Sequence, residues 1–222
     1  MEIENVRIDF LGHAGFLIRT NGKSIAIDPY NLSLNVDHKV DIILITHSHY
    51  DHCSIKDIQQ MSKRGTIIIA PPDAQSKVTR IRDIELKTLT LNQTFSTEDI
   101  KITSVPAYNI GKPFHEKSEE WFGYLIEFKD VIIYHAGDTD KIPEMAEIPK
   151  NSGGKILVSL LPVSGEYTMT AEEAAEAALV LKSSLAIPMH YAGGVAGTIE
   201  DAKRFINLCQ QKGINAKILD RM

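Results

Sequence analysis

The feature that most constrains how this chain can fold is a polar segment, residues 46–52, with the sequence Thr-His-Ser-His-Tyr-Asp-His. It directly follows an apolar run whose length and β-branched content are typical of a buried strand. Because alternate side chains of a strand point to the same side, His47 and His49 can point together where the backbone leaves the sheet. Asp51 and His52 follow where the chain turns toward a predicted helix. Imidazole nitrogens and a carboxylate in one short loop suit zinc, iron or manganese better than calcium or magnesium.

The alternative interpretation of this segment is a polar turn that is rich in histidine by chance. Three histidines and an aspartate within six positions, directly after a hydrophobic strand, are hard to explain by packing alone. Metal binding is therefore the strong inference, whereas the reaction is a separate question. Cys53 comes next, and we interpret it as a small buried side chain at the start of a helix rather than as a further ligand.

The size and charge of the chain narrow its class. A chain of 222 residues fits one domain, or two compact halves that share a core. No linker rich in proline, glycine or serine divides it, so we expect a single domain over residues 1–222. The net charge of -5 argues against a protein that mainly binds long nucleic acid through its phosphates. We expect no secretory signal and no membrane span, and two cysteines make a reducing cytoplasm the expected location.

Hydrophobic periodicity predicts strands first and then alternating strands and helices. Strands are expected at residues 6–11, 16–19, 24–28, 41–45, 66–70, 121–128, 131–135, 155–162, 184–189 and 216–219, with several short ones over 84–105. A hairpin turn is expected at Asn21-Gly22. Helices are expected over 55–63, from Pro71, after a capping box at Thr170 and around 202–209. Each half of the chain thus presents strands, then polar candidates, then βα units.

Further candidate site residues stand where predicted strands end. Asp28 precedes a proline at the end of the opening meander, and Asp138 follows Gly137 directly after the second hairpin. His190 comes at the end of the strand over 184–189. In isolation, an aspartate at such a place is a common turn residue.

The pattern His-x-His-x-Asp-His over residues 47–52 resembles the metal-binding signature of the metallo-β-lactamase superfamily. Gly-Asp-Thr over 137–139 resembles the segment whose aspartate bridges two metals in that family. Leu-Gly-His-Ala over 11–14 is similar to a motif of the branch that includes ascorbate-6-phosphate lactonase-like and N-acyl-phosphatidylethanolamine phospholipase D-like proteins. The resemblance covers essentially the full chain. It implies an α/β fold, the four-layer αββα sandwich, with two facing sheets, helices outside and a metal site along one edge.

The resemblance also implies a ligand set. His47, His49 and, as an open alternative, His115 would hold one metal, Asp51, His52 and His190 would hold the other, and Asp138 would bridge them. Asp28 would orient a ligand histidine by accepting its second N–H, and His13 would lie in the pocket wall.

One position departs from the family. The superfamily usually supplies a histidine directly after the strand that ends near residue 105, where this chain has Tyr108 and Asn109. We expect these two side chains to contact substrate or support the site. His115, in the loop that follows, could return to a metal or lie in solvent, and His135 is expected to be packed.

By resemblance, we expect a metal-dependent hydrolase with Asp51 and Asp138 in catalytic roles. Two divalent ions, most simply zinc but alternatively manganese or iron, would provide a metal-bound hydroxide, because zinc-bound water has a pKa of about 7. The expected substrate is a small ester, lactone or phosphodiester. The alternatives are a phosphodiesterase acting on nucleotides, nucleic acid or phospholipid, and a non-catalytic metal-binding protein of the same fold. Residues 107–120 and 163–169 are expected to decide the substrate, and the oligomeric state, a homo-oligomer included, is open.

Overall fold

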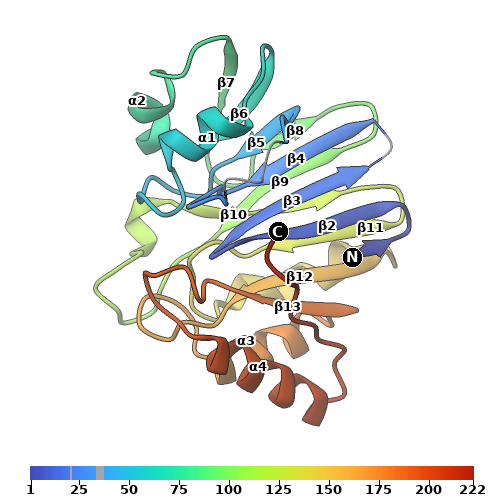
Figure 1. Ribbon diagram of the computed structural model, residues 1–222. Coiled ribbons are helices and arrows are strands. Elements are labelled where there is room, and N and C mark those ends of the chain that lie inside the picture. The colour runs from blue at the N-terminus through green and yellow to red at the C-terminus, as the bar shows by residue number, and fades with distance from the viewer. Residues whose placement is uncertain (21, 34–37) are drawn as a thin grey trace. The chain divides into compact units, whose positions relative to one another are not determined.

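The computed structural model describes residues 1–20, 22–33 and 38–222 (Figure 1). These residues form two compact units, one made of residues 1–90 with 219–222 and the other of residues 91–218. Each unit contains one sheet and its own helices, which confirms the mixed α/β class. The single domain over 1–222 stays a prediction, and Asn21 of the expected hairpin lies outside the described residues.

Within its described residues, the first unit has a seven-stranded sheet with the strands in sequence order. The strands are β1 (Glu2–Ile3), β2 (Val6–Gly12), β3 (Gly15–Thr20), β4 (Lys23–Ile27), β5 (Ile42–Leu44), β6 (Thr66–Ala70) and β7 (Ile84–Thr88). Strands β1 to β4 pair antiparallel, which confirms the predicted opening meander, and β4 to β7 pair in parallel. The helices are α1 (Ile55–Met61), the 3-10 helix η1 (Pro72–Ala74) and α2 (Gln75–Val78).

Strand β5 lies inside this sheet and carries the histidine-rich segment at its end. It pairs with β4 on one side and β6 on the other, and all its residues are buried. A strand that is covered on both faces must be apolar throughout, which explains the uninterrupted hydrophobic run before Thr46. The chain therefore passes directly from the core of the unit to the polar segment.

The second unit has a six-stranded sheet in the part of the chain that is described, in the order β13-β12-β11-β10-β9-β8. The strands are β8 (Thr94–Ser96), β9 (Lys101–Pro106), β10 (Phe122–Glu127), β11 (Val131–His135), β12 (Ile156–Pro162) and β13 (Leu185–Met189). The helices are η2 (Lys117–Glu119), η3 (Pro143–Glu147), η4 (Pro149–Asn151), α3 (Ala171–Val180) and α4 (Ile199–Gln211). Strands β11, β12 and β13 are mutually parallel, so their carboxyl ends meet at one edge of the sheet.

Short sequence motifs mark where the helices α3 and α4 of the second unit begin. The capping box before α3 is confirmed: the Thr170 hydroxyl accepts from Glu173 N, and the Glu173 carboxylate accepts from Thr170 N. Helix α4 starts earlier than the apolar pattern predicts, because Thr198 and Asp201 form a second capping box.

The predicted strand over 216–219 is wrong. Ala216 makes one isolated bridge with Ala186, and Leu219 already belongs to the first unit. A segment that changes from one unit to the other cannot continue a ladder along one sheet, although its alternate side chains are still partly buried.

A glycine allows the close contact between β10 and β11. A Cβ atom on Gly123 would lie 2.3 Å from the carbonyl oxygen of His135 and 2.6 Å from that of Ala136. Only glycine permits this approach, which occurs where β11 leads toward Asp138.

Candidate metal centre

The first group of candidate ligands belongs to the histidine segment, which we define as residues 46–52. His47 Nε2 lies 3.1 Å from His49 Nδ1, and His52 Nε2 lies 3.5 Å from Asp51 Oδ2. Two atoms that each bind a tetrahedral zinc at 2.0–2.1 Å are separated by roughly 3.3 Å. The donor chemistry and these separations therefore fit a zinc-like ion.

Asp28, the residue directly after β4, orients this segment. Its buried carboxylate accepts hydrogen bonds from Thr46 N at 2.9 Å and from the Thr46 hydroxyl at 2.6 Å. The same carboxylate lies 2.8 Å from His52 Nδ1. Since Nδ1 of His52 is engaged by Asp28, it is the Nε2 atom that faces Asp51. The resemblance implies such a contact between Asp28 and a ligand histidine, and metal binding by His52 stays a prediction.

Two residues of the first unit have closer contacts than the sequence indicated. His13 Nε2 lies 2.9 Å from Asp51 Oδ2, and His13, Asp51 and His52 offer ligand atoms within 4.8 Å of one another. His13, predicted to lie in the pocket wall, therefore joins the candidate ligands. Thr46 was not predicted as a site residue, yet its hydroxyl lies between Asp28 and His47 Nδ1, 3.0 Å from the latter. The one sequence feature that could have predicted this function for Thr46 is its position directly before His47.

The second group gathers around Asp138 at the edge where β11 and β13 end. Asp138 Oδ2 lies 3.1 Å from His190 Nε2 and 3.3 Å from His115 Nε2. His115 is only 5% exposed, so the alternative that leaves it in solvent is wrong. Its function as a ligand stays a prediction, but the loop after β9 does return it to Asp138.

The loop is held in this position by groups near its two ends. His115 Nδ1 donates to the carbonyl oxygen of Tyr167 at 3.1 Å, which turns Nε2 toward Asp138. Asn109 Nδ2 donates to the carbonyl oxygens of Phe114 at 2.9 Å and Tyr167 at 2.7 Å. Asn109 N also donates to the His115 carbonyl oxygen at 2.7 Å. Asn109 thus supports the loop that carries His115. The Tyr167 carbonyl could not be predicted as a partner, because a backbone oxygen has no signature in the sequence.

Tyr108, predicted beside Asn109 as a substrate contact, has a different environment. Its hydroxyl donates to the Glu144 carboxylate at 2.8 Å, and Lys117 Nζ lies over its ring. Burial, with Glu144 nearby, raises the pKa of Tyr108, so the hydroxyl stays protonated at neutral pH. Burial would raise the pKa of Glu144 too, but its own backbone amide, Lys117 and Tyr108 hold it below the ordinary value.

Two residues next to the candidate ligands are packed, as predicted. His135 is fully buried, and its Nδ1 accepts from Gly137 N at 3.2 Å. Cys53 is also buried, and burial raises the pKa of its thiol to about 11. A protonated thiol is a poor metal ligand, which agrees with the interpretation of Cys53 as a packing residue.

Four of the candidate residues share a strained backbone. His13, Asp28, His115 and His190 have positive φ angles of 55°, 41°, 57° and 60°. Such a conformation costs a residue other than glycine on the order of 1–3 kcal/mol, and it tends to occur at functional sites. Eight other non-glycine residues in the described part of the chain share this conformation, so it does not by itself distinguish the candidate residues.

Comparison with known proteins identifies the family. Residues 7–190 match the family described as the β-lactamase superfamily domain, and the chain belongs to this family. The UPF0173 metal-dependent hydrolase of Thermococcus kodakarensis is 37% identical over 203 residues, with 84% of each chain covered. A solved structure described as a metal-dependent hydrolase from Parabacteroides distasonis superposes with a TM-score of 0.82 at 31% identity, covering 98% of this chain and 94% of that one. The metallo hydrolase Igni18 from Ignicoccus hospitalis shares the fold, with a TM-score of 0.78 at 24% identity over 97% of this chain and 95% of its own.

These matches confirm the predicted metallo-β-lactamase-like fold and, at the level of the family, the class of metal-dependent hydrolase. The lactonase-like branch stays a prediction, because none of these names specifies it. In the described residues, no helix has the length and apolarity that crossing a membrane requires.

Proposed function

We propose that this chain binds two divalent metal ions and hydrolyses a small ester, lactone or phosphodiester. The observation that carries the proposal is the spacing of donor atoms within each group. His47 Nε2 and His49 Nδ1 are 3.1 Å apart, and Asp138 Oδ2 lies 3.1 and 3.3 Å from the Nε2 atoms of His190 and His115. Ligand atoms of one metal ion have this separation, and nitrogen with carboxylate oxygen is the donor set of hydrolytic zinc enzymes.

The proposed ligands follow the family assignment. They are His47, His49 and His115 for one ion, Asp51, His52 and His190 for the other, and Asp138 for both. Zinc is the proposed metal, with manganese and iron as alternatives. Two of the ligands are already oriented by other groups of the chain, since Asp28 engages Nδ1 of His52 and the Tyr167 carbonyl engages Nδ1 of His115.

Divalent ions held there would lower the pKa of a water molecule and stabilise negative charge on the substrate. The chain's own groups would handle the proton. Asp51 Oδ2 is 2.9 Å from His13 Nε2, so this pair can take up and hold a proton released in the reaction. Asp51 therefore keeps the catalytic function expected from the sequence, with His13 as its partner.

Exposed hydrophobic side chains near the ligands support a small substrate with an apolar part. Tyr50, between His49 and Asp51, is 63% exposed, and Ile110 and Phe114, in the loop of His115, are 58% and 44% exposed. Exposed apolar side chains close to ligands in the sequence can contact the apolar part of a substrate. They favour an ester or lactone with an apolar substituent over a nucleic acid, which would need cationic groups there. A cytoplasmic location is proposed on the two free thiols, Cys53 and Cys209.

Metal content tests the first part of the proposal. Protein purified without chelator or affinity tag is reloaded with zinc, and the zinc per chain is counted by mass spectrometry. We expect about two equivalents for the wild type and about one for His115→Ala. His38→Ala is the matched control, because His38 is half-buried and belongs to neither donor group, and it should match the wild type. One equivalent in the reloaded wild type, or two in His115→Ala, would contradict the ligand assignment.

Hydrolysis tests the second part. The zinc-loaded protein is assayed with para-nitrophenyl butyrate, γ-butyrolactone and bis-para-nitrophenyl phosphate, each also with Asp138→Ala. We expect cleavage of the ester or lactone by the wild type and its loss in the variant. If Asp138→Ala retained full hydrolysis of every substrate that the wild type cleaves, the mechanism would be abandoned. Cleavage of the phosphodiester alone would establish the phosphodiesterase alternative.

A further inference from the structure

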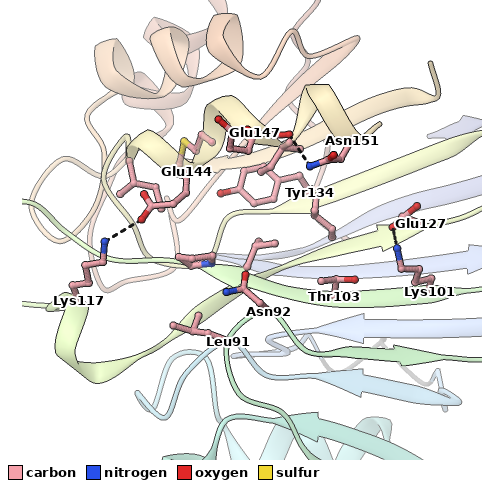
Figure 2. A pocket seen from close by; sticks show the side chains of 16 residues that line it. Leu91, Asn92, Lys101, Thr103, Lys117, Glu127, Tyr134, Glu144, Glu147 and Asn151 are labelled. Carbon is pink, nitrogen blue, oxygen red and sulfur yellow. Dashed lines mark hydrogen bonds and ion pairs between the residues drawn. The ribbon is translucent and has the colours of Figure 1, made fainter. Parts of the chain in front are cut away.

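The second unit contains a cavity of about 680 Å³ whose lining includes none of the proposed metal ligands (Figure 2). One wall is a face of the sheet. Thr103 on β9, Leu125 on β10 and Tyr134 on β11 are cross-strand neighbours in one row, so their side chains point to the same face. The other wall comes from η3 and η4 and the residue before them. Ligand sites for small molecules are typically cavities of about 300–1,000 Å³.

The lining is apolar in the middle and carries balanced charge at its ends. Its apolar lining residues include Val105, Leu125, Ile142, Met145 and Ile148. Each lysine of the lining is paired with a glutamate of the lining.

Lys101 Nζ lies 2.8 Å from Glu127 Oε1, and Lys117 Nζ lies 3.0 Å from Glu144 Oε1 (Figure 2). A third carboxylate, that of Glu147, is paired with Lys150 at 2.7 Å. Since these charges are already matched, the cavity offers no strong field of one sign, and an uncharged ligand suits it best.

Tyr134 places a hydroxyl group on one side of Leu125, as Thr103 does on the other. It is only 1% exposed, it lines the cavity, and its hydroxyl group makes no hydrogen bond with any residue that the structure describes. Tyr108, by contrast, donates its hydroxyl to Glu144. Among the described residues, this hydroxyl of Tyr134 is not one of the fully enclosed side-chain atoms that lack a partner, so the little surface that Tyr134 exposes includes it. A ligand in the cavity can therefore reach it, and tyrosine hydroxyls in such places usually take a hydrogen-bond partner. Burial raises the pKa of Tyr134, so its hydroxyl stays protonated at neutral pH and can donate a hydrogen bond.

We propose that this cavity binds an uncharged, mostly apolar small molecule that carries a hydrogen-bond acceptor, such as a ketone or ester carbonyl. The acceptor takes the hydrogen of the Tyr134 hydroxyl, and the apolar remainder packs against Leu125, Ile142 and Met145. The site is a second one on this chain, and it does not depend on metal binding.

A fluorescent probe of matching chemistry tests this. Prodan is a neutral naphthyl ketone whose emission moves to shorter wavelength when it leaves water. We expect saturable, blue-shifted binding to the metal-loaded wild type. Tyr134→Phe keeps the ring and removes the donor, so it should bind about three- to tenfold more weakly. Leu125→Trp fills the cavity and should abolish the blue shift.

Tyr124→Phe is the matched control. Tyr124 precedes Leu125 on β10 and therefore faces the other side of the sheet, outside the lining. This variant should bind Prodan as tightly as the wild type. Tyr134→Phe should also melt at the wild-type temperature or above, because the lost hydroxyl has no hydrogen-bond partner among the described residues.

Any of three binding results would overturn the proposal. They are the absence of saturable binding to the wild type, equal affinity of Tyr134→Phe and the wild type, and undiminished binding to Leu125→Trp. A marked loss of thermal stability in Tyr134→Phe alone would assign the hydroxyl a structural function and would likewise overturn it.

Discussion

Replacing Asp28 by asparagine tests how the chain prepares its metal ligands. The change keeps the size of the side chain and replaces one carboxylate oxygen by an NH2 group. The oxygen that remains can still accept from Thr46 N, at 2.9 Å in the wild type. The new NH2 group then stands where Oδ2 was, 2.6 Å from the Thr46 hydroxyl and 2.8 Å from His52 Nδ1.

The expected loss of zinc affinity depends on which partner of Asp28, Thr46 or His52, can adapt to the new NH2 group. The Thr46 hydroxyl can rotate and accept, but an N–H on His52 Nδ1 would face another donor. His52 must therefore move its proton to Nε2, the atom 3.5 Å from Asp51 Oδ2, and a protonated Nε2 cannot bind a metal. A hydrogen bond to a charged group contributes about 1.5–3 kcal/mol. Loss of such a partner typically weakens metal binding about 10- to 100-fold, which is about 1.4–2.7 kcal/mol, so the two estimates agree.

Zinc affinity measured by competition with a chromophoric chelator checks this, together with nitrogen NMR of the His52 tautomer. Asp57→Asn is the matched control, since Asp57 is a buried carboxylate of the same unit that accepts from Asn31 N at 2.9 Å and Leu32 N at 3.1 Å. It should lose stability and keep its zinc affinity. Wild-type affinity in Asp28→Asn, or an unchanged His52 tautomer, would refute the reasoning.

Two further predictions concern stability. Burial alone would raise the pKa of Asp9, but hydrogen bonds and charge from Arg19 and Arg7 outweigh it and hold the pKa below its ordinary value. A lowered folded pKa stabilises the protein above about pH 4, and this stabilisation is lost as the pH falls through the folded pKa. Asp9→Asn should therefore cost about 1 kcal/mol at pH 7 and progressively less as the pH falls below about 4, measured by urea unfolding. A pH-independent difference would contradict this. Gly123→Ala places a Cβ 2.3 Å from the His135 carbonyl oxygen and should cost about 1–3 kcal/mol or more in thermal unfolding, whereas an unchanged melting temperature would show that the strands can separate there without cost.

Local features of the sequence determined much of the fold and the order of candidate ligands. The apolar run before Thr46 predicted a buried strand, and β5 is central in its sheet. The capping box at Thr170 predicted the start of α3. Asp138 and His190 were found because each follows a strand. Such signals depend on a few consecutive residues, so they can be read without the rest of the chain.

Only the tertiary structure decided which buried atoms meet. His13 and Asp51 are 38 positions apart, and nothing in the local pattern of either residue predicts their 2.9 Å contact. His115 lies beside Asp138 because Asn109 and the Tyr167 carbonyl hold its loop, and a backbone oxygen has no signature in a sequence. Periodicity indicates that a side chain is buried, but its partner depends on hydrogen bonds made by residues far away in the chain. The sequence by itself therefore determined the types and the order of the candidate donors, and the tertiary structure decided their contacts within each unit.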